Sequence, residues 1–206
     1  MSWCREEGKS KVYYSSFGHE PKVWKDERFQ KHLMGGLKWA RLMELLEAIQ
    51  SRVSALKLSE PGPTREHLEQ ILRAGLRAPD HGRLKPSRFV VLEGAEKAKL
   101  ADAMAEMLRR KAPQCTQAQL DAERNKPMRA PTIVVVAARI SKGKIPEIEQ
   151  IASVAAGVQN MFLVAHALGY GAMWKTGAAA YDAEVKTALG LSPDDHIVAM
   201  LYLGTV

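Results

Sequence analysis

The chain has 206 residues, of which 46% are hydrophobic and 26% charged, a balance typical of a globular protein with one sizeable core. No apolar run approaches the roughly 20 residues that span a membrane, and the N-terminus has no apolar signal-peptide core, so we expect a cytoplasmic protein without a membrane partner. The net charge is +7, but basic residues are scattered among acidic ones without an aromatic platform, which argues against nucleic acid as a partner. Cys4 and Cys115 share no metal-ligand spacing, so we expect free thiols and no metal site.

The first 41 residues differ in composition from the rest and hold nine basic and five acidic residues. Lys11–Phe17 is rich in β-branched and aromatic residues and predicts a strand. Asp26 is a candidate N-cap for a helix that places Phe29 and Leu33 on one face. One strand and one helix cannot bury a core alone, so this segment must dock on the rest of the chain or stay mobile.

Helical periodicity recurs through the remaining residues. Leu42, Leu45, Leu46 and Ile49 have helical spacing, and Thr64 is the N-cap of a second helix. Further helices are predicted over 95–111, part of 112–128, 147–168 and 182–189. The helix at 147–168 is apolar nearly all round, which predicts burial in the core or in a subunit interface.

Strands are predicted between these helices, at Phe89–Leu92, Pro131–Ala137, Ala172–Trp174 and His196–Leu203. Pro131–Ala137 is apolar on both faces and is therefore expected in the centre of the sheet. The order of elements predicts an α+β sandwich in which an antiparallel or mixed sheet packs against helices.

Two polar segments are candidates for a binding site. The turn that runs from Arg77 to His81 is followed by Lys85, and converging cations suit an anion such as a phosphate. A solvated charged loop explains the same residues. Arg52 follows Ser51 at a helix end, where a surface arginine is also favourable with the helix dipole.

A third candidate follows the long apolar helix. Gly169 and Gly171 permit close approach of the backbone to a flat ligand, and Trp174 offers an aromatic wall. A helix stop followed by a core tryptophan is the alternative. Composition and spacing alone therefore indicate an α+β domain with a candidate anion site.

Taken together, seven segments in the same order resemble the nitroreductase family, in particular its small single-domain members. The segments are Leu45–Ile49 with Ser51-Arg52, Leu72–His81, Pro86–Val90, Arg129–Val135, Gln159-Asn160, Ala167–Trp174 and Leu201–Thr205. The resemblance covers residues 42–206. It implies a central, mostly antiparallel sheet flanked by helices, and a domain-entwined homodimer with FMN at the interface.

The resemblance also implies site residues, with both subunits contributing to each site. FMN contacts carried over from the family are Ser51, Arg52, Val53, Arg77, His81, Trp174, Lys175 and Thr176. The segment matched to NAD(P)H is Val164, Ala165, His166, Ala167, Leu168 and Gly169. The implied reaction transfers hydride from NAD(P)H through flavin to a small-molecule acceptor such as a nitro compound or quinone, without a catalytic side chain.

Three features depart from the family pattern. Ser51 and Val53 replace the outer residues of an Arg-Arg-Ser triplet, Ser87 replaces a tryptophan, and the sequence stops at Val206, where the family continues for some twenty residues. We therefore expect weaker retention of FMN. A flavin-binding dimer with little or no turnover is the alternative function.

Residues 1–41 resemble the last strand and helix of a trehalose-utilisation (ThuA-like) domain. The segment is only the tail of such a domain, so no function transfers with it. The resemblance predicts an N-terminal fragment fused to a nitroreductase-like domain. It leaves open a third reading, in which a non-catalytic scaffold or sugar-related module is led by this tail.

Overall fold

The computed structural model describes residues 2–7, 10–16, 22–40 and 45–206, which form two compact units divided between Leu45 and Leu46. The predicted strand end at Phe17 and helix start at Leu42 lie outside the described residues. The assignment of residues 1–41 and 42–206 to two domains of different origin stays a prediction.

The first unit contains a hairpin and a helix. Strands β1 (Ser2–Glu7) and β2 (Ser10–Ser15) pair antiparallel, and α1 (Glu27–Ala40) follows the short helix η1 (Val23–Lys25). The prediction of a single strand was wrong, because Ser2–Glu7 carries three charged residues and lacks an apolar alternation. The predicted N-cap is confirmed, since Asp26 Oδ1 accepts from the amide of Arg28 at 2.8 Å.

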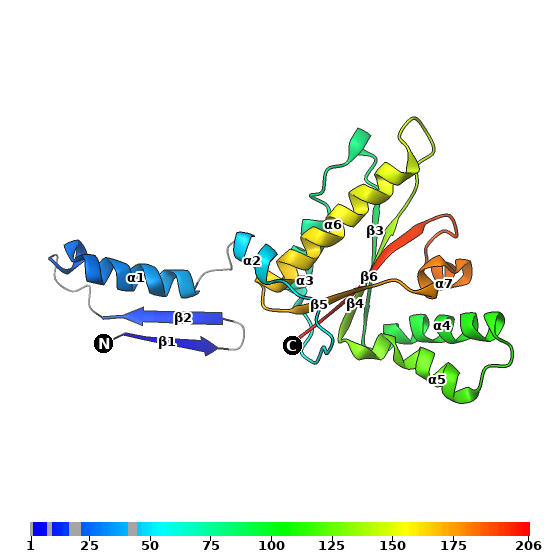
Figure 1. The fold of residues 1–206 in the computed structure, drawn as a ribbon, viewed down its shortest axis with the longest axis horizontal. Coiled ribbons are helices and arrows are strands. Elements are labelled where there is room, and N and C mark those ends of the chain that lie inside the picture. Colours follow the sequence, from blue (N-terminus) through cyan, green and yellow to red (C-terminus); the bar gives the residue numbers. More distant parts are fainter. Residues whose placement is uncertain (1, 8–9, 17–21, 41–44) are drawn as a thin grey trace. The chain divides into compact units, whose positions relative to one another are not determined.

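The second unit is built on one sheet in the order β3-β4-β6-β5, with every neighbouring pair antiparallel (Figure 1). Its strands are β3 (Ser87–Glu93), β4 (Thr132–Ala138), β5 (Gly171–Lys175) and β6 (His196–Gly204). Every residue of β4 is buried, which confirms its predicted central place. The α+β class and the antiparallel sheet are likewise confirmed.

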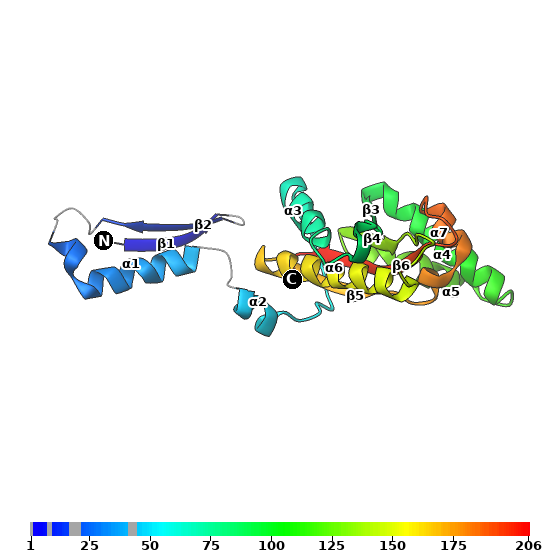
Figure 2. The ribbon, with the colours of Figure 1, turned by 90° about the horizontal axis from the view of Figure 1, so that it is seen from above.

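Helices cover both faces of this sheet (Figures 1 and 2). One face packs against α3 and α6 around Ile71, Val134 and Met161, and the other packs against α4 and α7 around Leu100 and Ile133. The helices are α2 (Leu45–Ser51), α3 (Arg65–Gly75), α4 (Lys97–Lys111), α5 (Gln117–Asn125), α6 (Glu147–Ala167) and α7 (Ala183–Ala188). Short 3-10 helices are η2 (His81–Arg83), η3 (Gly94–Glu96), η4 (Pro127–Arg129) and η5 (Ala178–Tyr181).

The 21-residue helix α6 is long and apolar enough to cross a membrane by length and composition alone. Val154, Val158 and Met161 nevertheless lie in the core of the unit, so one face of α6 is a core face. Ala152 and Ala156 lie on the opposite, exposed face. One face of the helix is therefore buried in the core, as its composition predicts, and the opposite face is exposed in the protomer.

A close helix crossing joins α6 to α3. A Cβ added to Gly157 would lie 2.4 Å from the carbonyl oxygen of Gly75, closer than non-bonded atoms approach. The obstacle is backbone, which cannot rotate away as a side chain can. The crossing distance of the two helices therefore depends on glycine at position 157.

We expect Gly157→Ala to lower the free energy of unfolding by about 2 kcal/mol, because the clash outweighs the gain of about 1 kcal/mol that alanine usually brings to a helix interior. Urea unfolding followed by circular dichroism measures the change. Gly143→Ala is the matched control, since a Cβ there meets nothing within 4 Å. A Gly157→Ala protein as stable as the native chain would contradict this packing.

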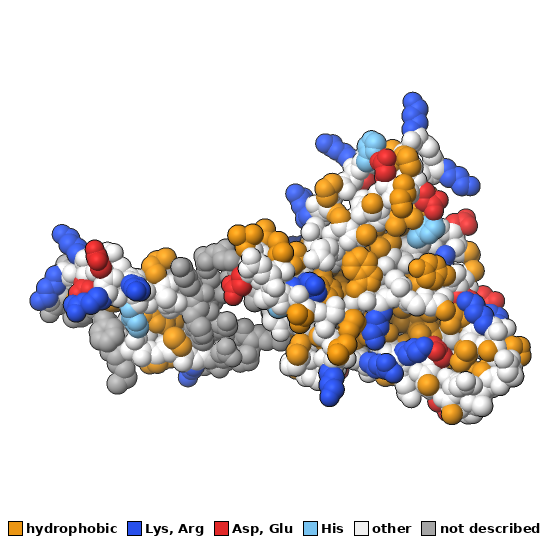
Figure 3. All heavy atoms as spheres, in the orientation of Figure 1, with side chains coloured by type: hydrophobic (Ala, Val, Ile, Leu, Met, Phe, Trp, Pro, Cys, Tyr) orange, Lys and Arg blue, Asp and Glu red, His pale blue; other side chains and the backbone are white. Residues whose placement is uncertain are grey.

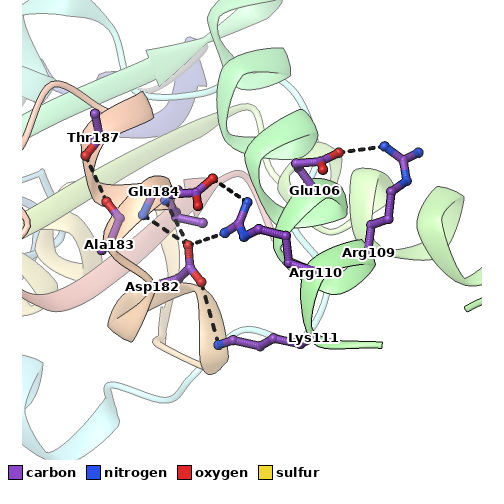
Figure 4. Close-up of polar contacts among 9 residues, drawn as sticks. Glu106, Arg109, Arg110, Lys111, Asp182, Ala183, Glu184 and Thr187 are labelled. Atoms are coloured by element: carbon purple, nitrogen blue, oxygen red, sulfur yellow. Dashed lines mark hydrogen bonds and ion pairs between the residues drawn. The ribbon is translucent and has the colours of Figure 1, made fainter. Parts of the chain in front are cut away.

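A polar cluster ties α4 to α7 on the other face of the sheet (Figure 4). Asp182 caps α7 by accepting from the amides of Glu184 and Val185, and the guanidinium of Arg110 donates to its carboxylate at 2.7 Å. Arg110 also pairs with Glu184, and Lys111 lies 3.7 Å from Asp182. Burial opposes ionisation of Asp182, but the Val185 amide and the two cations outweigh it and lower the pKa of that carboxyl.

We expect Asp182→Ala to destabilise the protein by about 1–2 kcal/mol through loss of the cap, and Asp182→Asn to cost less because an amide oxygen still caps the helix. Because the folded pKa is lowered, the charge contributes fully above the unfolded pKa of about 3.9, and this contribution disappears as pH falls through the folded value. Unfolding curves at pH 7 and pH 3 should therefore show that the native chain and Asp182→Asn differ less in free energy of unfolding at pH 3 than at pH 7. A difference that grows in acid would contradict the assignment.

Candidate functional site

The end of α2 lies beside the last turn of α6. The Ser51 hydroxyl donates to the Glu47 carbonyl at 2.6 Å, and its oxygen lies 2.9 Å from His166 Nε2. This geometry suits a His166 tautomer that carries its hydrogen on Nε2. Two segments that the sequence analysis treated separately, Ser51–Val53 and Val164–Gly169, are thus brought together.

Arg52 is held on the same part of α6. Its guanidinium carbon lies 4.6 Å from the centre of the Phe162 ring, a cation–π contact that leaves the N–H groups at the ring edge able to donate. Among the residues that the structure describes, Val53 has no comparable anchor, and 71% of its surface is exposed. Of the three neighbouring residues, two are therefore fixed against α6 and the third faces solvent.

Trp174 projects from β5 toward the face of the sheet that α6 covers. It lies opposite Leu201, which belongs to the core under α6, and its indole N–H donates to the Val198 carbonyl at 3.0 Å. The residue is 36% exposed. It is therefore an oriented aromatic wall and not a fully buried core residue.

Lys175, the next residue, projects to the opposite face of the sheet. It pairs with Met200, which belongs to the core under α4, and its ammonium lies 4.8 Å from the Tyr202 ring centre. Lys175 and Thr176 line a pocket on that face. The side chains of the predicted Trp174-Lys175-Thr176 segment thus lie on two different faces of the sheet.

Arg77 and His81 lie away from the α2 end of the site. His81 Nδ1 is 2.5 Å from Glu149 Oε2 in the first turn of α6, whereas Ser51 contacts His166 in its last turn. At 1.5 Å per residue these two positions are about 25 Å apart along the helix. Arg77 is exposed and follows Gly75, which meets the middle of α6. Within one protomer the predicted FMN residues therefore do not form a single group.

The loop that carries His81 has an unusual backbone. Gly82, Arg83 and Lys85 all have positive φ angles of 72°, 53° and 52°, and the Lys85 amide donates to the Asp80 carboxylate at 2.7 Å. Two non-glycine residues in this region indicate a conformation imposed by the surroundings. His81 and Lys85 are both exposed on this loop, and the binding of an anion there stays a prediction.

The segment Val164–Gly169 ends α6. The amide of Tyr170 donates to the Ala165 carbonyl and that of Gly169 to the His166 carbonyl, with Gly169 at a φ of 84°. This is a Schellman ending, in which glycine takes the left-handed position. Ala165 is fully buried, whereas Val164, His166, Ala167 and Leu168 are partly exposed and Gly169 is exposed.

Sequence reasoning did not find the partners that fix these residues. Phe162 under Arg52 and Glu149 beside His81 come from one helix whose apolar pattern indicated only burial. Glu147 also lies 2.8 Å from His196 at the start of β6. The only sequence signal for these contacts was the pair of acidic residues in the first turn of α6. Acidic residues there are favourable with the helix dipole, which does not indicate which side chain they contact.

Comparison with protein-family models divides the chain at the same place as the composition. The model described as "Nitroreductase family" matches residues 49–205. The model described as "Trehalose utilisation" matches residues 1–40.

Individual proteins agree with the first match. The chain is 41% identical over 164 residues to "Putative NAD(P)H nitroreductase YdjA" of Escherichia coli strain K12, an alignment that covers 79% of this chain and 88% of the relative. It is 32% identical over 169 residues to "Putative NAD(P)H nitroreductase" of Haemophilus influenzae, covering 79% and 89%.

Solved structures share the fold. A nitroreductase-like family protein from Bacillus cereus superposes with a TM-score of 0.67 at 24% identity over 80% of this chain and 87% of that one. A protein described as a "putative nitroreductase in complex with fmn", from Desulfovibrio desulfuricans, superposes with a TM-score of 0.61 at 26% identity, covering 80% of this chain and 87% of that one. Together with the extent of the family match, these likenesses establish that the chain belongs to the nitroreductase family and is an oxidoreductase.

Proposed function

We propose that the protein is an FMN-dependent oxidoreductase that transfers hydride from NAD(P)H to nitro compounds, quinones or similar small acceptors. The observation that carries the proposal is the placement of Arg52 and Trp174 on the α6 side of the sheet, in a chain 41% identical to a protein named as an NAD(P)H nitroreductase. The FMN bound in the structure from Desulfovibrio desulfuricans supports the choice of flavin.

The residues present fit the chemical demands of FMN. A flat ring system needs an exposed, oriented wall, and the bonded Trp174 indole supplies one. A phosphate needs a cation with free N–H groups, and the guanidinium of Arg52 rests on a ring instead of a carboxylate among the described residues. When bound, FMN supplies the two-electron chemistry.

The protein's own residues would bind FMN and the nicotinamide nucleotide and orient them. Arg52 neutralises phosphate charge, Ser51 and His166 hold the end of α2 against α6, and Trp174 sets one boundary of the ring site. Gly169 has no side chain, so the nicotinamide nucleotide can approach the exposed end of α6 closely. No side chain is assigned a proton transfer.

A second copy of the chain would complete the site. His81 and Ser51 contact opposite ends of α6, so an antiparallel α6 from a two-fold partner brings His81 of one protomer to the Ser51 end of the other. The apolar face of α2 supports this arrangement, since Leu46 is 72% exposed and Leu45 and Ile49 are also exposed. Figure 3 shows hydrophobic side chains gathered over α2 and the exposed side of α6. We therefore infer a homodimer.

A flavin-binding dimer with little turnover is the second candidate, and the exposed Val53 and the hydrogen-bonded Ser51 favour it. Both lie where a family member would offer further phosphate contacts. An absorbance spectrum of the purified protein, followed by anaerobic addition of NADH or NADPH, separates the two. A flavin spectrum that bleaches supports the reductase, and a flavin spectrum unchanged by either nucleotide supports the binding protein. Protein that neither carries nor takes up FMN would overturn both.

We expect Arg52→Met to raise the dissociation constant for FMN about 10- to 100-fold, because a charge-assisted hydrogen bond to phosphate contributes about 1.5–3 kcal/mol. Arg52→Lys should lose less, since it keeps the charge. Fluorescence titration of the apoprotein with FMN measures the constants. The exposed Arg139 gives the matched control Arg139→Met, and equal affinities for this variant and Arg52→Met would refute the assignment.

For the dimer, we expect Ala156→Glu to weaken self-association at least about tenfold, because it places a charge in the middle of the exposed α6 face and opposite its own symmetry mate. Sedimentation equilibrium measures the monomer–dimer constant. Ala118→Glu, on the exposed surface of α5, should leave it unchanged. A native chain that stays monomeric at tens of micromolar would exclude the proposed interface.

A further inference from the structure

A pocket of about 410 Å³ lies on the α4 side of the sheet, opposite the face that carries Trp174. It extends between α4, α5, η4 and the segment after β5. Volumes of roughly 300–1,000 Å³ are typical of small-molecule sites. Neither the hydride transfer proposed above nor the residues assigned to it require a cavity on this face, although Lys175 and Thr176 border it.

The charged groups of the pocket have a surplus of positive charge. Lys126, Arg129 and Lys175 line it together with one carboxylate, Glu123, which pairs with Lys126. Within the part of the chain that the structure describes, Arg129 and Lys175 have no carboxylate partner. Burial lowers the pKa of Lys175, and the nearby charges of Arg129 and then Lys126 lower it further, as expected of cations gathered without a compensating anion.

Tyr202 adds a neutral donor between these cations. Its ring lies beneath the Lys175 ammonium at 4.8 Å, and burial raises its pKa to about 12, so the phenol keeps its proton at neutral pH. A protonated phenol can donate to an anion that Arg129 and Lys175 attract. The polar end of the pocket thus offers three donor groups and one carboxylate that is already paired.

The remainder of the lining is apolar and adaptable. Met104, Met107 and Met200 contribute flexible thioether side chains, and Ala178 and Ala179 contribute small ones. Methionine accommodates apolar groups of varied shape. The walls are also fixed relative to one another, because Arg110 of α4 binds Asp182 next to η5 (Figure 4). A preformed pocket loses less conformational entropy on binding than a mobile one.

We propose that this pocket binds a small organic carboxylate carried on an apolar body, on the opposite face of the sheet from Trp174, and that Lys175 serves this ligand in place of FMN. The planar guanidinium of Arg129 can donate to both carboxylate oxygens, Lys175 and Tyr202 can donate to the same group from the strands, and the methionines enclose the apolar body. The evidence for this site comes only from residues on the α4 side of the sheet, so the site does not depend on the proposed hydride transfer.

The test is calorimetric titration of the full chain, saturated with FMN where it takes FMN up, with 2-naphthoate and with the neutral isostere 2-naphthylmethanol. We expect one site for the carboxylate and at least about tenfold weaker binding of the alcohol. Arg129→Met should weaken the naphthoate about tenfold, Arg129→Lys less, and the exposed Lys142→Met not at all. The Arg129 variants avoid every residue assigned to FMN, and circular dichroism establishes that they are folded.

Four results would overturn the proposal. These are absence of saturable binding, equal affinity for the alcohol, naphthoate binding to the FMN-free chain that FMN abolishes, and full competition by millimolar inorganic phosphate. The third would place the ligand in the flavin site and the fourth would leave a simple anion site. A chain that binds no FMN but binds naphthoate through Arg129 would refute the proposed function and support this site, so the two failures are distinguishable.

Discussion

The packing of one face of α6 against the sheet and α3 determines where the candidate site residues lie. The Gly75–Gly157 crossing brings α3 to within backbone contact, and the loop after α3 then delivers His81 to the first turn of α6. At the last turn, His166 and Phe162 hold Ser51 and Arg52. Because a helix is rigid, these two groups are kept about 25 Å apart, and no side-chain rotation in one protomer can join them.

That separation supports the proposed homodimer. Hydrophobic residues exposed singly are normal on a protein surface, but Leu45, Leu46 and Ile49 are exposed together on one helix. Their burial against a second copy would remove apolar surface from water and so stabilise the dimer. The same contact would supply the missing half of each site, so assembly and binding are parts of one proposal.

Much of the fold follows from local pattern. The wholly apolar β4 indicated a central strand, and Thr64 indicated a helix start that the structure confirms, with its hydroxyl accepting from the His67 amide. The strand at Ser2–Glu7 was missed because its stability comes from pairing with β2 and from the stacking of Trp3 on Tyr14, which are contacts between two strands. The His81–Glu149 and Ser51–His166 pairs join residues 68 and 115 positions apart, and a single sequence carries no signal for such pairs.

The alternation of side chains along a strand, in contrast, can be read from the sequence, and it determines that neighbouring residues of β5 face opposite sides of the sheet. Successive side chains of a strand point to opposite faces, so Trp174 and Lys175 could not both face one flat ligand once the segment was recognised as a strand. The structure places the indole on the α6 side of the sheet and the ammonium over Tyr202 on the other side. Any ligand of the α4-side pocket would therefore contact the strand that carries the aromatic wall, and the two sites would share a backbone without sharing a cavity.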